Sequence, residues 1–291
     1  MKLSTKDIET LAQVALDAAK KAVTFIQSKV TQSHNITLKD GVENLATQVV
    51  TAVDIESQRI ILELLEPTIK IFDLGLLTEE LPDDNSRFTK DYFWCIDPLD
   101  GTLPFTEQEP GYAVSIALIN KAGEPIMGAV LDPYQGDNWV AIRGRGVMRN
   151  QSPYKFTVQS KTLVISFDRS FLSSAEHKPT IDALELIREK LGFDYLEIGT
   201  GYGAVMNAMR LLTAGSGCYV KWPKATRGGG YIWDYAATRL IYEELNLPVS
   251  TALGNPIPLN QRDPYMNKHG VLYATSDALH EAILEVGKPF N

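Results

Sequence analysis

The segment Asp97-Pro98-Leu99-Asp100-Gly101-Thr102 constrains this chain more than any other feature, because it directly follows the apolar run 93–96. An apolar run that ends in proline and glycine predicts a buried strand followed by a sharp turn. Two carboxylates three residues apart on that turn can point into one small volume, where a hard cation such as Mg²⁺ relieves their repulsion. The same sequence is also a good type I turn, so by itself it could do no more than reverse the chain.

Neighbouring backbone groups and further acids extend the metal hypothesis. Gly101 lets a ligand approach the backbone closely, and the N–H groups after such a turn can hold phosphate oxygens. Glu79-Glu80 ends an apolar run and is expected at the end of a strand, although acidic pairs are commonly solvated loop charges. Asp234 reads as the N-cap of an apolar helix, and Asp54 as a first-turn acid of another. Each acid therefore has an ordinary structural interpretation beside the functional one.

The composition bounds the classes of protein to which this chain can belong. It has 291 residues and a formal net charge of −8, which argues against general nucleic-acid binding because that needs a basic face. There is no apolar run of about 18 residues, so no membrane partner is expected, and the polar start lacks the apolar core of a signal peptide. Cys95 and Cys218 are expected as buried thiols, which fits a cytoplasmic location. An acidic protein that binds phosphate must gather positive charge locally, from metal ions or a basic loop.

Two amphipathic helices are predicted near the start of the chain. Apolar residues recur at three- and four-residue steps over residues 5–30, which is typical of one long helix, and Ser4 with Asp7 forms a capping box at its start. A second helix over 51–66 is expected to turn Ile55 inward and to end before Pro67.

Beyond residue 90 the chain mixes expected strands and helices. The strands are 93–96, 112–120, 126–131, 139–142, 163–167 and 218–221, and the helices are 179–191, 203–214, 234–245 and 277–286. A turn-rich joint between the second and third strands predicts a hairpin. A polar stretch at 150–162 suggests a joint between an N-terminal half, 1–155, and a C-terminal half, 156–291. This mixture favours layered α/β sheets over a Rossmann array.

Four segments in chain order resemble the inositol monophosphatase superfamily, which includes inositol monophosphatases, 3'(2'),5'-bisphosphate nucleotidases and sugar bisphosphatases. Residues 50–54 are similar to its V-T-x-x-D segment and Glu79-Glu80 to its G-E-E segment. Residues 94–102 resemble the highly specific W-x-I-D-P-[IL]-D-G-T signature, and residues 232–237 resemble the W-D-x-A-A segment. Thr78 stands where the family often has glycine, but no departure touches a metal carboxylate. The resemblance implies a layered αβαβα sandwich of the α/β (α+β) class.

The resemblance also implies a role for each motif residue. Two or three Mg²⁺ ions would be held by four carboxylates and one carbonyl, those of Glu79, Asp97, Asp100, Asp234 and Leu99. The amides of Gly101 and Thr102 would receive the phosphate. Glu79 and Thr102, with Thr102 held by Asp54, would orient and activate the attacking water. Phosphoryl transfer needs charge neutralisation and positioning more than covalent help, so no nucleophilic side chain is expected.

The substrate is expected to meet a basic loop. In inositol monophosphatases an acidic residue shortly before W-D accepts hydrogen bonds from inositol hydroxyls, whereas Lys221 stands at the equivalent position here. Residues 221–230 carry three cations and no acid, so they could receive a second phosphate, although a solvated surface loop is the other interpretation. The expected substrate contacts are Asp100, Gly101, Thr102, Lys221 and Asp234. The favoured reaction is removal of the 3'-phosphate from adenosine 3',5'-bisphosphate to give AMP.

Other substrates and functions stay open. Inositol 1-phosphate and a sugar bisphosphate are alternative substrates, and a catalytically silent protein that binds phosphorylated ligands is an alternative of another class. The four histidines have no metal-ligand spacing, which argues against zinc, and residues 199–203 lack the context of a dinucleotide fingerprint. Besides a small phosphate monoester as partner, the resemblance implies inhibition by lithium and allows a homodimer, which the sequence itself does not show.

Overall fold

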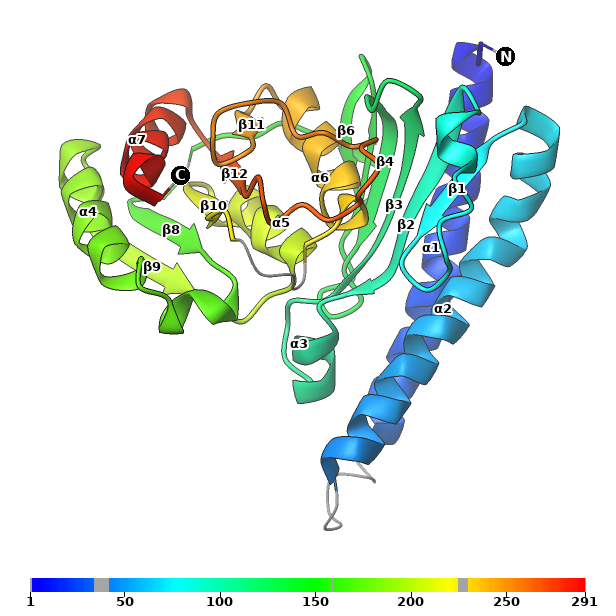
Figure 1. Ribbon diagram of the computed structural model, residues 1–291, viewed down its shortest axis with the longest axis horizontal. Coiled ribbons are helices and arrows are strands. Elements are labelled where there is room, and N and C mark those ends of the chain that lie inside the picture. Colours follow the sequence, from blue (N-terminus) through cyan, green and yellow to red (C-terminus); the bar gives the residue numbers. More distant parts are fainter. Residues whose placement is uncertain (1, 34–41, 159, 225–229, 291) are drawn as a thin grey trace.

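The computed structural model describes residues 2–33, 42–158, 160–224 and 230–290. Over these ranges the chain stacks helices and sheets in five layers, which run across the view of Figure 1. Helices α1 (Thr5–Ser33) and α2 (Val42–Phe72) form one outer layer, and α4 (His177–Lys190) and α7 (Asp277–Gly287) form the other. Two sheets lie between them and enclose α5 (Ala204–Ala214) and α6 (Ile232–Glu244). The expected αβαβα arrangement is confirmed.

The larger sheet has seven strands in the described part of the chain, and their spatial order follows their sequence order. They are β1 (Gly75–Thr78), β2 (Tyr92–Asp100), β3 (Ala113–Asn120), β4 (Pro125–Leu131), β5 (Asn138–Ile142), β6 (Gly146–Arg149) and β7 (Ser152–Tyr154). β1 runs parallel to β2, and the later neighbours pair antiparallel. The expected hairpin is the β3–β4 pair, which confirms that prediction.

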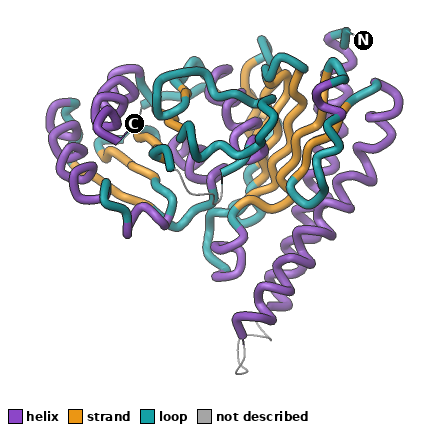
Figure 2. The backbone as a smooth tube through the Cα atoms, viewed as in Figure 1, coloured by secondary structure: helices purple, strands orange, loops and turns teal. Residues whose placement is uncertain are grey.

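The smaller sheet contains five described strands in the order β11-β12-β10-β8-β9. Their bounds, in that order, are Val249–Ser250, Val271–Ala274, Gly217–Lys221, Thr162–Ser166 and Tyr195–Gly199. β8, β9 and β10 are parallel, so their carboxyl ends meet at one edge of the sheet, where ligands commonly bind in open α/β sheets. Figure 2 shows both sheets in orange, separated by helices.

Alternation along β2 joins the layers on either side of the larger sheet. Trp94 and Ile96 pack with α1 and α2, whereas Phe93 and Cys95 belong to the apolar cluster that contains α5 and α6. Both faces of the strand are covered, which explains why its sequence is apolar without interruption up to Asp97.

The two N-terminal helices follow their predictions in part. The capping box of α1 is present, since Ser4 N donates to Asp7 Oδ2 at 2.8 Å and Asp7 N donates to Ser4 Oγ at 3.2 Å. The prediction that the second helix ends before Pro67 is wrong, because α2 continues to Phe72 with the proline inside it. The last turns are held against β2, where Trp94 Nε1 donates to Thr68 Oγ1 at 2.9 Å, and this packing offsets the hydrogen bond that proline cannot make.

The inward face of α2 also differs from its prediction. Ile55 is 52% exposed, while Asp54, Ser57 and Gln58 are buried. Ser57 and Gln58 follow Asp54 by three and four positions, so all three residues lie on one stripe of the helix. Helical periodicity alone favours apolar residues on the buried stripe, but this part of α2 passes the candidate site and is polar for that reason.

Most other expected elements are present with shifted ends, and Glu79 follows the end of β1 as predicted. Sequence analysis missed β6, β7, β9, β11 and β12, which are too short or too exposed to show a pattern. β7 ends the larger sheet at Tyr154, and β8 begins the smaller one at Thr162. The division into halves 1–155 and 156–291 stays a prediction.

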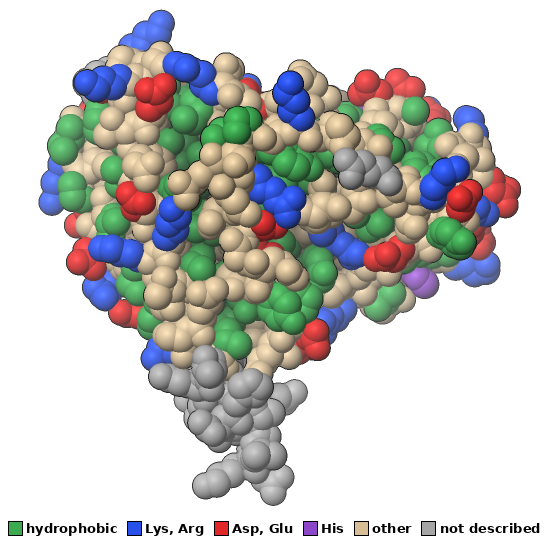
Figure 3. Space-filling model, turned by 180° about the vertical axis from the view of Figure 1, so that it is seen from behind, with side chains coloured by type: hydrophobic (Ala, Val, Ile, Leu, Met, Phe, Trp, Pro, Cys, Tyr) green, Lys and Arg blue, Asp and Glu red, His purple; other side chains and the backbone are tan. Residues whose placement is uncertain are grey.

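Charges of both signs are mixed over the surface. On the face in Figure 3, the Lys and Arg side chains lie interspersed with Asp and Glu. The arginines of β5–β6 and their turn have acidic partners: Arg143 contacts Glu243 at 2.6 Å, and Arg149 contacts Asp137 at 2.6 Å. Among the described residues, no helix is both long and apolar enough to cross a membrane.

Candidate active site

A β-bulge in β2 brings the two acids of the central turn to one face of the larger sheet. In the ladder with β3, Asp97 pairs with Ser115 and Asp100 with Ala113, so three steps on β2 oppose two on β3. Residues three apart on a regular strand point to opposite faces, and the extra residue cancels this alternation. Leu99 therefore packs with α1 and α2, while both aspartates face the middle layer. Sequence spacing predicted the convergence, and the bulge is its cause.

Asp97, Asp100 and Asp234 form a buried acidic cluster. Each offers one carboxylate oxygen, and these oxygens lie within 4.8 Å of one another. The three residues are only 2%, 8% and 8% exposed. Burial, followed by the nearby carboxylates, raises the pKa values of Asp97 and Asp100 well above their ordinary range. Burial raises the pKa of Asp234 to about 6. A backbone hydrogen bond from Tyr231 and the charge of Lys221 lower this pKa and so limit the rise.

Asp100 is held by the start of α5, in the middle layer of the molecule. Its Oδ1 accepts a hydrogen bond from Ala204 N at 3.0 Å, and its Oδ2 accepts one from Val205 N at 2.9 Å. The N-terminus of a helix favours negative charge, so α5 both orients this carboxylate and stabilises it. Gly203 makes the contact possible, since a Cβ atom there would lie 2.4 Å from Asp100 Oδ2.

Asp234 enters the cluster from the first turn of α6. The prediction that it is the N-cap is wrong: Tyr231 is the N-cap, and Asp234 occupies the third helical position. Its Oδ2 accepts a hydrogen bond from Tyr231 N at 3.0 Å, which fixes the carboxylate at the helix start. Asp234 therefore both accepts a backbone hydrogen bond at the start of α6 and contributes a carboxylate to the acidic cluster.

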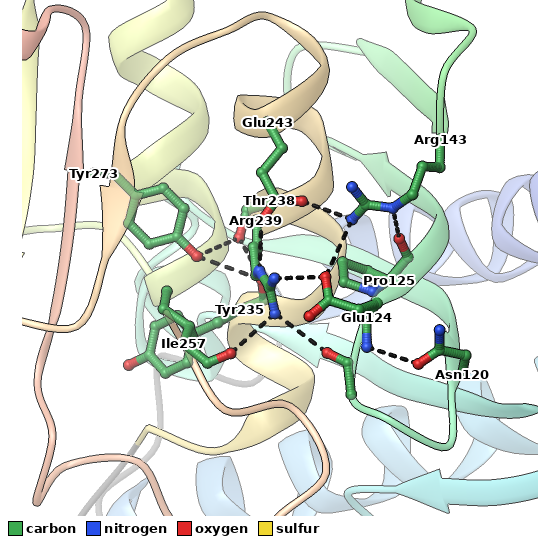
Figure 4. A network of polar contacts seen from close by, with 11 residues as sticks. Asn120, Glu124, Pro125, Arg143, Tyr235, Thr238, Arg239, Glu243, Ile257 and Tyr273 are labelled. Carbon is green, nitrogen blue, oxygen red and sulfur yellow. Dashed lines mark hydrogen bonds and ion pairs between the residues drawn. The ribbon is translucent and has the colours of Figure 1, made fainter. Parts of the chain in front are cut away.

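A second buried cluster of charge fixes α6 one turn further along (Figure 4). Arg239 is 7% exposed and donates to Glu243 at 2.7 Å, to Glu124 at 2.8 Å, and to the carbonyls of Ile257 and Gly123 at 3.0 and 3.2 Å. These partners come from α6 itself, from the β3–β4 turn and from the loop after β11. The network therefore locks the helix that carries Asp234 against the larger sheet.

Glu79 lies beside the cluster at the end of β1 and is positioned by α2. Gln58 Oε1 accepts hydrogen bonds from the Thr78 hydroxyl and from Glu80 N, which flank Glu79 on both sides. Ser57 Oγ donates to the Pro98 carbonyl at 2.9 Å and so ties the same helix to the central turn. Sequence analysis missed both residues, although their spacing from Asp54 marks one helix face.

Two further acids have strongly raised pKa values. The Glu79 side chain reaches solvent, but protein surrounds its carboxyl, and this burial followed by the charges of Asp234 and Glu80 raises its pKa to about 8. Burial, followed by the charge of Glu80, raises the pKa of Asp54 to about 7. The predicted contact between Asp54 and Thr102 stays a prediction.

The donor set fits a hard divalent cation. Carboxylate oxygens are the ligands that Mg²⁺ prefers, and a cation would relieve the repulsion that raises these pKa values. Asp97, Asp100 and Asp234 are close enough to share such an ion, and Glu79 interacts electrostatically with Asp97 and Asp234. The Leu99 carbonyl stays a predicted ligand, while the Leu99 amide donates to Asp97 Oδ1 at 3.0 Å.

A pocket of about 470 Å³ opens beside the acidic cluster. Its near wall holds Asp100, Gly101, Thr102 and Asp234. Gly101 adopts a left-handed conformation with φ of +81°, and a Cβ atom there would lie 2.5 Å from the Gly111 carbonyl oxygen. Only glycine therefore fits at this turn.

The carboxyl ends of the parallel strands β8, β9 and β10 form the far wall of the pocket. Asp168 and Arg169 follow β8, Thr200 follows β9, and Lys221 ends β10. Lys221 Nζ lies 2.6 Å from Asp168 Oδ2, and Tyr219 OH donates to Asp168 Oδ1 at 2.9 Å. Lys221 thus lines the pocket with an acidic partner that the sequence did not reveal, and its predicted contact with the substrate stays a prediction.

Arg169 and Glu107 join two segments distant in the chain at the edge of this pocket. Glu107 ends the short helix α3 (Thr102–Glu107), and Arg169 begins the 3-10 helix η2 (Arg169–Ser173). Their side chains make two parallel hydrogen bonds of 2.7 Å. No sequence motif marks this pair, because its members lie 62 residues apart.

Comparison with known proteins places these motifs in one family. A sequence profile described as "Inositol monophosphatase family" matches residues 7–287. The chain belongs to the inositol monophosphatase family. It is accordingly a metal-dependent phosphoric monoester hydrolase, in agreement with its acidic cluster.

Relatives in this family act on different phosphate esters. The chain is 24% identical over 273 residues to the inositol-1-monophosphatase of Bacillus subtilis, covering 92% of this chain and 94% of that protein. It is 32% identical over 197 residues to the 3'-phosphoadenosine 5'-phosphate phosphatase of Mycobacterium leprae, covering 66% of each protein. The comparisons therefore leave the substrate divided between these two classes.

Solved structures share the fold at low sequence identity. An inositol monophosphatase from Anabaena (Nostoc) sp. PCC 7120 superposes with a TM-score of 0.68 at 21% identity, covering 99% of this chain and 98% of that one. An IMPase/NADP phosphatase in complex with NADP and Ca²⁺ superposes with a TM-score of 0.71 at 20% identity, covering 98% and 96%. These likenesses bear on the fold.

Proposed function

We propose that the protein is a Mg²⁺-dependent phosphatase that removes the phosphate from a small phosphorylated metabolite by attack of water. The observation that carries this proposal is the convergence of three buried carboxylates beside a 470 Å³ pocket. Asp97, Asp100, Asp234, Glu79 and the Leu99 carbonyl would hold two or three ions. When bound, the metal neutralises charge on the phosphate and lowers the pKa of water.

The protein's own groups would bind the phosphate and move one proton. The amides of Gly101 and Thr102, two residues that line the pocket, donate to phosphate oxygens. The Glu79 carboxylate, which lies beside the acidic cluster at the end of β1, accepts the proton of the attacking water. Thr102, held by Asp54, orients that water. α5 and α6 keep Asp100 and Asp234 in place during the reaction.

The leading substrate class is an ester whose leaving alcohol carries no second phosphate, such as inositol 1-phosphate. The full-length likeness to the Bacillus subtilis enzyme and the acidic partner of Lys221 support this class. The second candidate is a bisphosphate nucleotide such as adenosine 3',5'-bisphosphate. The Mycobacterium leprae relative and the cation of Lys221 on the pocket wall favour it.

Phosphate release from a panel of monoesters, with and without Mg²⁺, tests the proposed chemistry. Asp97→Asn should lower kcat/KM by more than about 100-fold, because even partners outside the ligand shell of a metal contribute 10- to 100-fold. Asp182→Asn is the matched control, since it makes the same charge change in an exposed ion pair on α4. Absence of Mg²⁺-dependent release from every ester by the folded wild-type protein would reject the proposal.

A further inference from the structure

The two cations that line the described pocket wall are each paired with an acid of the protein. Lys221 contacts Asp168 at 2.6 Å, and Arg169 contacts Glu107 at 2.7 Å. An anion-binding wall would instead present donors whose charge is not already balanced. We propose that Asp168 is a specificity-determining residue, which balances the charge of Lys221 and thereby disfavours substrates whose leaving group carries a second phosphate. The proposal rests on the phosphatase function given above.

The position of Asp168 follows from the topology of the smaller sheet. Lys221 and Tyr219 are two residues apart on β10 and point to the same, inner face, since Tyr219 belongs to the middle apolar cluster. β8 is the parallel neighbour of β10, and Asp168 lies two residues beyond its end. Asp168 therefore arrives beside Lys221 with one carboxylate oxygen on Nζ and the other on the Tyr219 hydroxyl.

This ion pair is largely buried, and its burial determines how Lys221 can interact with a ligand. Lys221 is 7% exposed at its side chain and Asp168 is 23% exposed. Separating a buried pair leaves an uncompensated charge, so Lys221 does not readily exchange its partner for a phosphate. Gly230 packs closely against the ammonium group, because a Cβ atom on it would lie 2.8 Å from Lys221 Nζ. A second phosphate at this wall would meet the Asp168 carboxylate together with the ammonium group.

The other charged residues that the structure describes in this pocket do not offset Asp168. Asp100 and Asp234 also line it, but they belong to the acidic cluster that a metal would neutralise. Arg169 has both ends of its guanidinium fork on Glu107. Asp168 and Lys221 together offer a hydrogen-bond acceptor and a donor to an uncharged alcohol, so the wall suits a leaving group with hydroxyls.

Two nucleotides that differ only in the second phosphate test this proposal. The ratio of kcat/KM for adenosine 3',5'-bisphosphate to kcat/KM for adenosine 3'-monophosphate should favour the monophosphate in the wild-type protein. Asp168→Asn should raise this ratio about tenfold or more, because a charge-assisted hydrogen bond to Lys221 becomes available. Asp168→Ser, which keeps a hydroxyl near Tyr219, should raise it in the same direction.

Two further variants separate a charge effect from a structural one. In the double variant Asp168→Asn/Lys221→Gln no cation is left to exploit, so the ratio should fall back toward the wild-type value. Asp182→Asn, with the same charge change on α4, should leave the ratio unchanged. A merely structural role of Asp168 would lower both rates together and leave the ratio unmoved.

The outcomes distinguish this proposal from the phosphatase function itself. A wild-type protein that prefers the bisphosphate tenfold, or an unchanged ratio in whichever Asp168 variant folds, overturns the role of Asp168 and leaves the phosphatase function standing. Absence of Mg²⁺-dependent release from both nucleotides and from inositol 1-phosphate would reject the phosphatase function first. The wild-type ratio alone suffices to overturn the proposal if neither variant folds.

Discussion

Helix α6 passes through two buried clusters of charge that are built in opposite ways. Around Arg239, near the middle of the helix, one cation meets two carboxylates and two carbonyls at hydrogen-bond distance. Around Asp234, in the first turn, three carboxylates crowd within 4.8 Å. A second cation, Arg143, contacts Glu243 at 2.6 Å, so the charges of the first cluster balance within the protein, whereas the second has an excess of negative charge.

The difference separates structural charge from functional charge. A buried ion pair with satisfied hydrogen bonds fixes an element in place and leaves no unbalanced charge for a ligand. Carboxylates crowded together with raised pKa values lower the stability of the protein unless a proton or a cation joins them. The pocket wall follows the first design, since Lys221 and Arg169 have partners. By this criterion the acidic cluster needs a cation from outside, while each cation of the described pocket wall already has an acidic partner.

Removal of the Arg239 side chain should cause the largest loss of stability. Arg239→Met leaves two carbonyls and two carboxylates without their shared donor, and should lower the free energy of unfolding by about 3 kcal/mol. The value is near the lower end of the usual cost because the Glu124 side chain is 48% exposed. Urea unfolding followed by circular dichroism measures the change.

The matched control removes a cation from an exposed pair. Lys178→Met on α4 should change the free energy of unfolding by less than about 1 kcal/mol. Equal effects of the two substitutions would contradict the view that the Arg239 cluster is a buried structural lock.

Asp54→Asn should stabilise the metal-free protein, and only at high pH. Folding raises the pKa of Asp54 from its ordinary value of 3.8 to about 7, so the folded state keeps the proton to higher pH. The resulting stability is fully present below pH 3.8 and is lost as the pH rises toward 7. The gain from asparagine should therefore grow over this range to at most about 4 kcal/mol, at about 1.4 kcal/mol per pKa unit.

Thermal unfolding in a chelator at several pH values measures this dependence. Asp7→Asn is a control of opposite sign, because the Ser4 cap lowers the pKa of Asp7 and makes its carboxylate stabilising. A stabilisation by Asp54→Asn that is as large at pH 4 as at pH 8 would contradict the electrostatic explanation.

Glu107→Gln should have the smallest effect on stability. The pair with Arg169 is exposed, at 46% for the arginine and 39% for the glutamate, so its loss should cost less than about 1 kcal/mol. It should raise the bisphosphate-to-monophosphate ratio by less than Asp168→Asn does, because solvent screens Arg169. A larger rise than that of Asp168→Asn would shift the specificity role from the buried pair to the exposed one.

The acids of the site could be predicted from the sequence because each lies in a short local motif. The turn after a buried strand identified Asp97 and Asp100, and the strand end identified Glu79. The layered fold followed from the mixture of helices and strands together with the family resemblance. The bulge that turns Asp97 and Asp100 to one face could not be predicted, because it depends on how β2 pairs with β3, a separate segment of the chain.

The residues that sequence analysis missed depend on contacts between distant segments. Asp168 reaches Lys221 only because β8 and β10 are parallel neighbours in the smaller sheet. Its other partner, Tyr219, lies 51 residues further along the chain. Gln58 was not predicted as a site residue, because helical periodicity favours apolar residues such as Ile55 on the inward face of α2. In the structure Ile55 is exposed and Gln58 is buried. Lys221 alone reads as a free contact for a second phosphate, because the sequence does not show that Asp168 lies beside it. Residues 225–229 of the basic loop lie outside the described residues, so the role of that loop stays a prediction.

Calorimetric titration of Mg²⁺ into the metal-free protein at pH 8 tests the central claim most directly. The claim is that the carboxylates around Asp234 bind a metal cation, because the protein's own side chains do not balance their negative charge. We predict saturable binding to the wild-type protein, strong weakening by Asp97→Asn or Asp234→Asn, and unchanged binding in Asp182→Asn. Mg²⁺ binding that is absent from the wild-type protein, or equal in all four proteins, would contradict the account.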